Sequence, residues 1–293
     1  MTSSIVRRQS VISDELQGSD LHPVLKKVYA NRGVTSLDEI SYSLSDLVDF
    51  SLLKDIDVAA DIVADAVIHS KRILVVGDFD VDGATSCAVM IRSLRAFGLE
   101  NVDYLIPNRF DFGYGLSPQL VDVAVEIHAQ DKPELIITVD NGISSIEGVD
   151  RTSEHGIPVV VTDHHLAGDE LPAAAAIVNP NQPGCEFPEK SIAGVGVAFY
   201  LMLAVRAVLR DCKWFDEKKA EPNMANYLDL VALGTVADVV PLEENNRILV
   251  EAGLQSIRRN KACVGINALL TIAGKSIQRC STQDFGFVIG PRL

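Results

Sequence analysis

Short apolar runs recur through the middle of the chain and alternate with segments of helical periodicity. The apolar runs predict strands within residues 72–78, 101–107, 134–140 and 157–163, with a fifth candidate at 173–180. The helical segments between them lie at 58–70, 83–98, 117–130 and 144–156. The strand runs do not alternate with polar residues, which is the pattern of strands buried on both faces. Strands and helices that alternate over short connections predict an α/β fold with a parallel β-sheet and helices on both faces.

Helical patterns flank this α/β region. Residues 1–54 are polar and weakly periodic, with a turn at Gly33, and we expect an N-terminal helical arm that packs on the main domain. Residues 193–211 form one apolar segment that is too short and, with Arg206, too interrupted to span a membrane, so it is interpreted as a buried helix. Further helical segments follow, and the main domain is expected to cover residues 55–275 and to end in a helical part.

The charge balance is acidic. The chain has 26 basic and 40 acidic residues, a formal net charge of −14. Taken alone, this charge argues against a nucleic-acid partner, because binding a polyanion usually needs a basic surface. The objection weakens if the acidic residues gather to hold divalent cations, since bound metal inverts the local field.

The cysteines and the N-terminus bear on location. Five cysteines, an odd number, include no CxxC pair, which predicts free thiols in a reducing compartment. Arg7 and Arg8 are not followed by the apolar segment of a signal peptide. We therefore expect a cytoplasmic protein without membrane attachment.

Aspartates follow three of the predicted strands. Asp78, Asp80 and Asp82 follow the first, Asp140 follows the third, and Asp163 follows the fourth, directly before His164 and His165. Because the carboxyl ends of parallel strands lie along one edge of a sheet, these side chains are expected to meet in one crevice. Neighbouring carboxylates cannot all stay ionised without counter-charge, and oxygen ligands with one or two imidazoles suit Mn²⁺ or Mg²⁺ better than Zn²⁺.

Each of these pieces also has a purely structural explanation. Asp-Gly and Asn-Gly are common turn dipeptides, and an aspartate after a strand often caps the next helix. A pair of histidines is more often structural than catalytic. The joint occurrence of Asp-x-Asp-x-Asp-Gly, Asp-Asn-Gly and Asp-His-His after three strands favours a metal site over turn chemistry.

The segments "VVGDFDVDGATS", "ITVDNGIS", "VVTDHH" and "LGTVADVVPL" resemble, in this order, the DHH phosphoesterase superfamily over roughly residues 70–245. "IPNRFDFGYGLS", "VNPNQPGCEFP" and "AGVGVAFYL" are similar to its RecJ-type exonuclease branch. Small-substrate relatives usually carry a histidine four residues before the first metal-binding aspartate, where this chain has Val76. The resemblance therefore favours the exonuclease branch.

The resemblance implies a role for each site residue. Asp80 would serve one metal and Asp82 the other, Asp140 would bridge them, and His164 and Asp238 would complete the second. Asp78 would join the first metal or orient a water, and Asp163 would orient the histidines. His165 would face the scissile phosphate or the leaving oxygen. Asp238 is the least secure of these ligands on sequence alone, because "TVADVVP" also fits a simple helix end.

Two glycine-containing segments are candidates for substrate binding. Arg109 is a candidate phosphate contact, with Gly113 and Gly115 allowing close backbone approach, and a surface arginine in a glycine loop is the equal alternative. The segment "SIAGVGVAF" could offer helix N-terminal N–H groups to a phosphate, although glycines for tight helix packing explain it almost as well.

The implied activity is a hydrolase reaction, the metal-dependent 5′→3′ exonuclease digestion of single-stranded DNA in recombination and repair. Residues 276–293 resemble the start of a connector to further domains that are expected to supply most of the DNA contacts. We therefore expect this chain to be monomeric, to act with repair proteins, and to bind Mn²⁺ but cleave DNA weakly.

Two rival functions stay open. One is a small-substrate phosphodiesterase of the same superfamily, acting on oligonucleotides, cyclic dinucleotides or pyrophosphate. The other is a catalytically inert scaffold that binds partners. A dinucleotide-binding sheet is disfavoured, because no GxGxxG follows the first strand.

Overall fold

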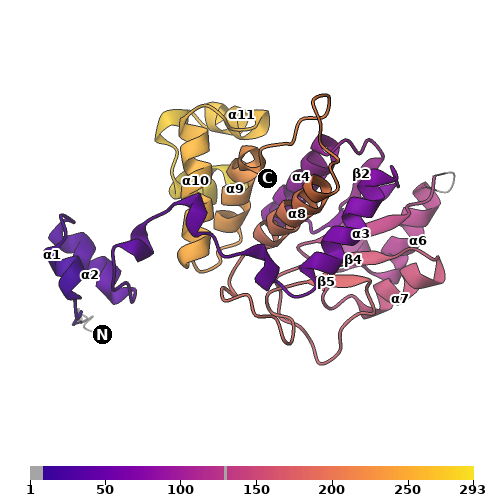
Figure 1. Ribbon diagram of the computed structural model, residues 1–293, viewed down its shortest axis with the longest axis horizontal. Coiled ribbons are helices and arrows are strands. Elements are labelled where there is room, and N and C mark those ends of the chain that lie inside the picture. The colour runs from indigo at the N-terminus through magenta and orange to yellow at the C-terminus, as the bar shows by residue number, and fades with distance from the viewer. Residues whose placement is uncertain (1–8, 129–130) are drawn as a thin grey trace.

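A five-stranded parallel β-sheet forms the centre of the protein (Figure 1). The computed structural model describes residues 9–128 and 131–293, apart from the side chain of Arg109; the basic pair Arg7 and Arg8 and the end of the helix predicted at 117–130 lie outside them. The strands are β1 Ile73–Gly77, β2 Val102–Leu105, β3 Leu135–Val139, β4 Val159–Thr162 and β5 Ala176–Val178. Their order is β2-β1-β3-β4-β5, and all neighbours are parallel. The predicted fold class is confirmed.

Helices cover both faces of this sheet. They are α1 Asp14–Gly18, α2 Pro23–Asn31, α3 Ile56–Ile68, α4 Val81–Ala96, α5 Arg109–Phe112, α6 Pro118–Ile127, α7 Ile146–Glu154, α8 Gly194–Asp211, α9 Leu228–Ala237, α10 Glu244–Arg258, α11 Val264–Ile272 and α12 Thr282–Asp284. Helices α3, α4 and α8 pack on one face, and α6 and α7 cover the other (Figure 1). Helices α9 and α10 extend the first layer, because α9 packs on α4, α8 and α10.

Alternate strand residues enter two separate cores. Val75 and Ile137 pack with α3, α4 and α8, whereas Val76 and Ile136 pack with α6 and α7. The residues of β1, β3, β4 and β5 are all buried, which explains their largely apolar runs. The edge strand β2 differs, because Asp103 and Tyr104 are exposed, so the expectation that it is buried on both faces is wrong.

The N-terminal arm divides into two parts. The segment near residues 39–53 contacts the main body, where Arg247 donates to the Glu39 carbonyl oxygen at 3.1 Å and the Val48 N–H donates to Asn245 Oδ1 at 3.0 Å. Helices α1 and α2 instead lie apart from the main body (Figure 1). The expectation that the whole arm packs on the main domain is therefore wrong for α1 and α2, whose Leu16 is buried within their own small unit.

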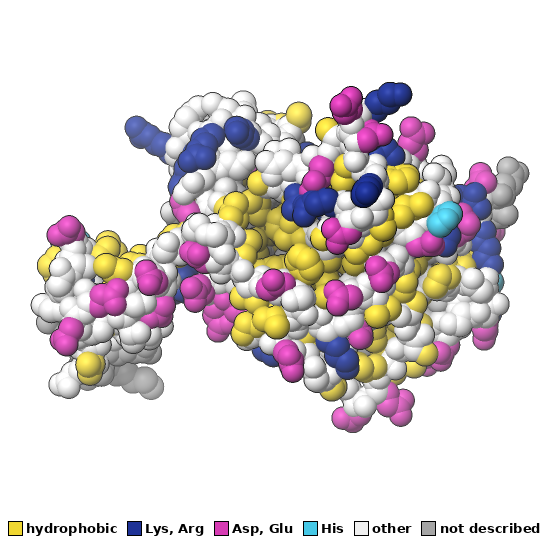
Figure 2. All heavy atoms as spheres, viewed as in Figure 1, with side chains coloured by type: hydrophobic (Ala, Val, Ile, Leu, Met, Phe, Trp, Pro, Cys, Tyr) yellow, Lys and Arg dark blue, Asp and Glu magenta, His cyan; other side chains and the backbone are white. Residues whose placement is uncertain are grey.

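The surface and the helices bear on two further expectations. Hydrophobic side chains gather on the middle of the face shown in Figure 2, and Lys and Arg side chains occur there as separated groups. Over residues 9–128 and 131–293, no helix has the length and apolar character that crossing a membrane requires. All five cysteines lie in these ranges and are free thiols, as predicted.

Gly148 in α7 tests the packing of this helix. A Cβ at Gly148 would lie 1.8 Å from the Leu116 carbonyl oxygen, a backbone atom that cannot move aside alone. We expect Gly148→Ala to lower the free energy of unfolding by about 1–3 kcal/mol, since overpacking outweighs the gain in helix propensity. Chemical denaturation measures this change. Gly265→Ala in α11 is the matched control, because nothing lies within 4 Å of its added Cβ; an equal effect at both positions would contradict the packing described here.

Candidate metal centre

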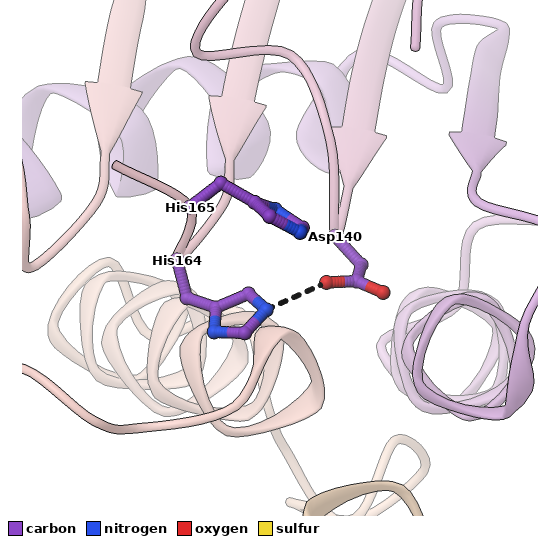
Figure 3. Close-up of side chains that lie close together, drawn as sticks. All are labelled: Asp140, His164 and His165. Carbon is purple, nitrogen blue, oxygen red and sulfur yellow. Dashed lines mark ion pairs between the residues drawn. The ribbon is translucent and has the colours of Figure 1, made fainter. Parts of the chain in front are cut away.

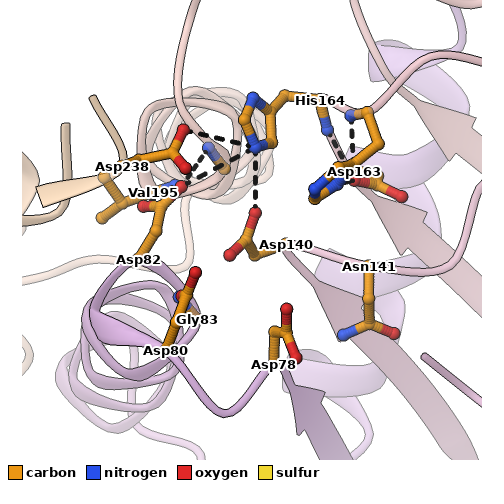
Figure 4. Close-up of polar contacts among 12 residues, drawn as sticks. Asp78, Asp80, Asp82, Gly83, Asp140, Asn141, Asp163, His164, Val195 and Asp238 are labelled. Atoms are coloured by element: carbon orange, nitrogen blue, oxygen red, sulfur yellow. Dashed lines mark hydrogen bonds and ion pairs between the residues drawn. The ribbon is translucent and has the colours of Figure 1, made fainter. Parts of the chain in front are cut away.

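The carboxyl ends of β1, β3 and β4 bring the predicted site residues together. In this strand order the chain reverses its direction of winding between β1 and β3, and ligands bind at such a switch point in open α/β sheets. The aspartates after β1 and the aspartate after β3 lie on the two sides of this point (Figure 4). The topology therefore explains why residues far apart in sequence meet here.

The loop after β1 passes directly into α4. Asp80 is the N-cap of α4 and accepts a hydrogen bond from the Gly83 N–H at 2.9 Å. The capping role that turn chemistry suggested is thus present, but only one of the Asp80 oxygens makes it. Asp82 lies in the first turn of α4 and is 1% exposed. Gly83 permits the tight turn, since a Cβ there would lie 2.4 Å from the Asp78 carbonyl oxygen.

The N-terminus of α8 holds the Asp82 carboxylate. The Gly194 N–H donates to Asp82 Oδ2 at 2.7 Å, and the Val195 N–H donates to Asp82 Oδ1 at 3.0 Å (Figure 4). The expectation that these N–H groups bind a phosphate is therefore wrong, because a buried carboxylate already accepts from them. The alternative of close packing is correct for Gly194, whose Cβ would lie 2.4 Å from Asp140 Oδ1.

Asp140 occupies the centre of the site. Its backbone φ is 60°, in the left-handed region that a non-glycine residue seldom adopts. The next side chain, Asn141, is fully buried and donates to the carbonyl oxygens of Val76 at 3.2 Å and Val139 at 2.9 Å. These bonds secure the loop after β3 and so fix the direction of the Asp140 carboxylate.

His164 faces three carboxylates from three different elements. Its Nε2 lies 3.1 Å from Asp140 Oδ1, 3.5 Å from Asp238 Oδ2 and 4.0 Å from Asp82 Oδ2 (Figures 3 and 4). Asp238 is the C-cap residue of α9, so it is both the helix end and a member of the cluster. The four side chains that the sequence placed around a common point do meet there.

A second set of oxygen atoms lies on the other side of Asp140. Single ligand atoms of Asp78, Asp80 and Asp140 lie within 4.8 Å of one another, as do those of Asp82, His164 and Asp238. Asp140 also forms such a group with His164 and His165. Asp140 therefore lies between two potential cation positions, where a bridging ligand would have to lie.

Several buried atoms of this cluster face one another as ion pairs but make no hydrogen bond. Among the described residues, Asp140 Oδ1, His164 Nε2 and Asp238 Oδ2 are buried and make no hydrogen bond. Leaving such groups unsatisfied is costly, and here they converge on one point. A divalent cation would satisfy all three, so the donor set fits Mn²⁺ or Mg²⁺.

Burial dominates the electrostatics of the cluster. It raises the pKa of Asp140 to about 9, and the charges of Asp80 and Asp163 add to the rise. Burial also raises the pKa of Asp82, with Asp140 and Asp238 contributing, and it raises the pKa of Asp238 and of Asp78. A cation would supply the missing counter-charge and allow these groups to ionise.

Asp163 orients the histidine pair. Its Oδ1 lies 2.7 Å from His165 Nδ1 and accepts from the His164 N–H at 2.7 Å, and its Oδ2 accepts from the Ile143 N–H at 2.9 Å. Burial alone would raise the pKa of Asp163, but the contact with His165 and these hydrogen bonds lower it. The contact with Asp163 in turn raises the pKa of His165. Asp163 thus contacts the ring of His165 but only the backbone N–H of His164, and its orienting role stays a prediction.

Tyr114 is a site residue that the sequence reasoning missed. Its hydroxyl lies 3.1 Å from His165 Nδ1 and 3.2 Å from His165 Nε2. Burial and the nearby carboxylates of Asp163 and Asp78 raise the pKa of Tyr114, which therefore stays protonated. The available signal was its place between Gly113 and Gly115, in a segment interpreted only as a source of phosphate contacts.

The candidate substrate-binding residues lie in the same loop. Gly113 and Gly115 have φ angles of 76° and 74°, which favour glycine. A Cβ at Gly115 would lie 2.8 Å from Ser145 Oγ, so the close approach at this position is to another part of the protein. The side chain of Arg109 lies outside the described residues, and its phosphate contact stays a prediction.

Comparison with known proteins agrees with this geometry. The family model described as "DHH family, N-terminal domain" matches residues 72–235. The single-stranded-DNA-specific exonuclease RecJ of Salmonella typhimurium is 55% identical over 98% of this chain and 49% of its own length. Crystal structures of RecJ from Thermus thermophilus cover 96% of this chain. The match to the structure with Mn²⁺ extends over 37% of that RecJ chain, at 30% identity and a TM-score of 0.73. The match to the structure with Mg²⁺ extends over 34% of that chain, at 28% identity and a TM-score of 0.65.

The fold and the site define an α/β protein with a cluster of acidic and histidine side chains, suited to hold two cations, at the carboxyl edge of its sheet. The chain belongs to the DHH family, whose model covers more than half of it. It spans about half the length of the curated relatives that it matches.

The raised pKa values predict how stability depends on pH. A carboxyl whose pKa is raised by folding stabilises the folded state when protonated, and that stability is lost as the pH rises through its folded-state pKa. We expect the free energy of unfolding of EDTA-treated protein to fall between about pH 5 and pH 8, by about 1.4 kcal/mol per pH unit for each extra proton bound by the folded state, and the Tm to fall with it. Asp238→Asn is expected to flatten this slope, and Mn²⁺ to reduce it. A Tm that rises over this range in EDTA would contradict the account.

The shared position of Asp140 predicts a distinctive effect on metal binding. We expect the wild-type chain to bind two Mn²⁺ ions in isothermal titration calorimetry. Asp140→Asn should lower the affinity for both ions, and Asp78→Asn the affinity for only one, in each case by about 10-fold or more. Even the loss of an indirect partner of a metal ligand lowers metal affinity by this much. The exposed Asp103 on β2 provides a control, Asp103→Asn, which should bind as wild type. If Asp140→Asn and Asp78→Asn each weakened the binding of only one ion, Asp140 would not be a shared ligand.

Proposed function

We propose that this chain carries the catalytic part of a metal-dependent exonuclease that hydrolyses phosphodiesters of single-stranded DNA. The observation that carries the proposal is the position of Asp140 between two ligand groups: it belongs to the group with Asp78 and Asp80, and its Oδ1 lies 3.1 Å from His164 Nε2, which belongs to the other. It is supported by relatives up to 55% identical that are named single-stranded-DNA-specific exonucleases. Two cations held on either side of one carboxylate suit phosphodiester hydrolysis.

The chain's own residues would divide between two cations. Asp78, Asp80 and Asp140 would hold one, and Asp82, Asp140, His164 and Asp238 the other. When bound, the cations would supply Lewis-acid stabilisation of phosphoryl charge and activation of water. The α8 N–H groups would keep the Asp82 carboxylate directed at its ion, because both donate to it.

His165 is suited to proton transfer at the leaving group. Its side chain is 43% exposed, whereas that of His164 is only 11% exposed. Asp163 accepts from its Nδ1 side, which fixes the tautomer and stabilises the imidazolium form. Protonated His165 would donate to the leaving oxygen through Nε2, and Asp163 would offset the charge before that transfer.

The exonuclease proposal is favoured over the small-substrate alternative by two observations. Val76 is buried in the core formed with α6 and α7, so the position that carries a histidine in small-substrate relatives does not face the cluster here. Relatives that are 53% and 55% identical to this chain are named for single-stranded DNA. An inert scaffold is disfavoured because every predicted ligand is present and gathered.

Several finer properties belong to the same proposal. We propose 5′→3′ polarity, action in recombination and repair together with repair proteins, a cytoplasmic location and a monomeric state. The division into residues 1–54, 55–275 and 276–293 stays a prediction. The net charge of −14 is compatible with a DNA substrate, because bound cations would turn the acidic crevice into an attractive one.

A substrate panel tests the proposal. With Mn²⁺, we expect slow release of mononucleotides from a 5′-phosphorylated single strand, and none from a blunt duplex or from pyrophosphate. His165→Ala should lower the rate by about 100-fold or more, the usual contribution of a general acid, with Mn²⁺ affinity unchanged. His69→Ala is the matched control, because His69 is exposed at the end of α3. Hydrolysis of pyrophosphate or a cyclic dinucleotide alone would favour the small-substrate alternative.

A further inference from the structure

Tyr114 lies beside the candidate metal centre on a loop that is held by a hydrogen bond to Ser145. The residues on both sides of it are glycines in the left-handed region, and the following Leu116 N–H donates to Ser145 Oγ at 3.0 Å. The Tyr114 hydroxyl also donates to the Asp140 carbonyl oxygen at 3.4 Å. The side chain is 51% exposed, so it forms part of the rim of the crevice.

The hydroxyl of Tyr114 meets His165 in an unusual way. It lies at nearly equal distances, 3.1 and 3.2 Å, from the two ring nitrogens. An oxygen in the plane of the imidazole could not do so, because Cε1 lies between the nitrogens and would clash with it. The hydroxyl therefore rests over the face of the ring, and the two rings meet edge to face at 75° and 5.6 Å.

This placement leaves the in-plane bonds of His165 undisturbed. Nδ1 is engaged by Asp163 Oδ1 at 2.7 Å, in a bond that by itself permits the partly exposed ring to swing about its side chain. A hydroxyl over the ring face blocks that swing. Nε2 then keeps a fixed direction toward the crevice, where His165 lies close to Asp140 and His164 (Figure 3).

We propose that Tyr114 is a positioning residue that fixes the plane of the His165 imidazole for proton transfer. The inference rests on the proposed function, because positioning matters only if His165 takes part in the reaction. The hydroxyl is the essential group: Tyr114→Phe keeps the aromatic ring and its edge-to-face contact with His165, and removes only the hydroxyl contacts with the His165 ring nitrogens and the Asp140 carbonyl oxygen.

A double-mutant cycle tests this coupling in the full chain. We expect Tyr114→Phe to lower kcat on a 5′-phosphorylated single strand with Mn²⁺ by about 10-fold or more, with KM changed little, since misplacing a reacting group costs rate more than binding. In the His165→Ala background the same change should have no further effect. Tyr104→Phe on β2 is the matched control, because Tyr104 is 56% exposed. Loss equal to that control, or an undiminished effect in the His165→Ala background, would overturn the proposal.

A second measurement separates this inference from the proposed function. In NMR spectra of protein with isotope-labelled histidines, the His165 ring signals should shift in Tyr114→Phe but not in Tyr104→Phe. Calorimetry should show unchanged Mn²⁺ affinity in both variants. If the wild-type chain cleaves no phosphodiester, the proposed function fails while the NMR result still tests the contact. Unshifted His165 signals would overturn the positioning role.

Discussion

The burial of several carboxylates around one point is the constraint on which the rest of this structure depends. Asp82 and Asp140 are each 1% exposed, and Asp238 lies close enough to reach the same imidazole. Without a cation, burial raises the pKa of all three, so the site must take up protons or remain strained. A fold that gathers acids in this way is suited to bind cations. Without them, the free energy gained from hydrophobic packing elsewhere must offset the cost of burying these carboxyl groups.

The surrounding backbone keeps the cluster closed by close approach and by unusual conformations. A Cβ at Gly234 would lie 2.8 Å from Asp82 Oδ1, and one at Gly194 would lie 2.4 Å from Asp140 Oδ1. Asp140 and Val239, the residue after Asp238, both have positive φ angles, which are costly for side chains of these kinds. The predicted ligands Asp82, Asp140 and Asp238 therefore keep their directions because glycines or residues with positive φ angles lie beside them. These local features are separate from the hydrophobic core.

Features that follow a period or a topology could be predicted from sequence. The five strands appear where mainly apolar runs predicted them, although β2 includes the exposed Asp103, and parallel pairing alone brings Asp80, Asp140 and His164 to one edge. Interactions that depend on side-chain direction across distant segments could not. A phosphate was one of two explanations for the α8 N–H groups, and their actual partner, Asp82, is 112 residues away in sequence. Tyr114 and the separate position of α1 and α2 depend likewise on tertiary geometry, which local patterns do not encode.

The most direct test of the central claim is a crystal structure of the protein grown with Mn²⁺, in which anomalous scattering locates the ions independently of any assumed ligand. We predict two anomalous peaks, one among Asp78, Asp80 and Asp140 and one among Asp82, Asp140, His164 and Asp238, with Asp140 bound to both. Peaks only at surface carboxylates, with the His164 imidazole bound to none, would contradict this prediction.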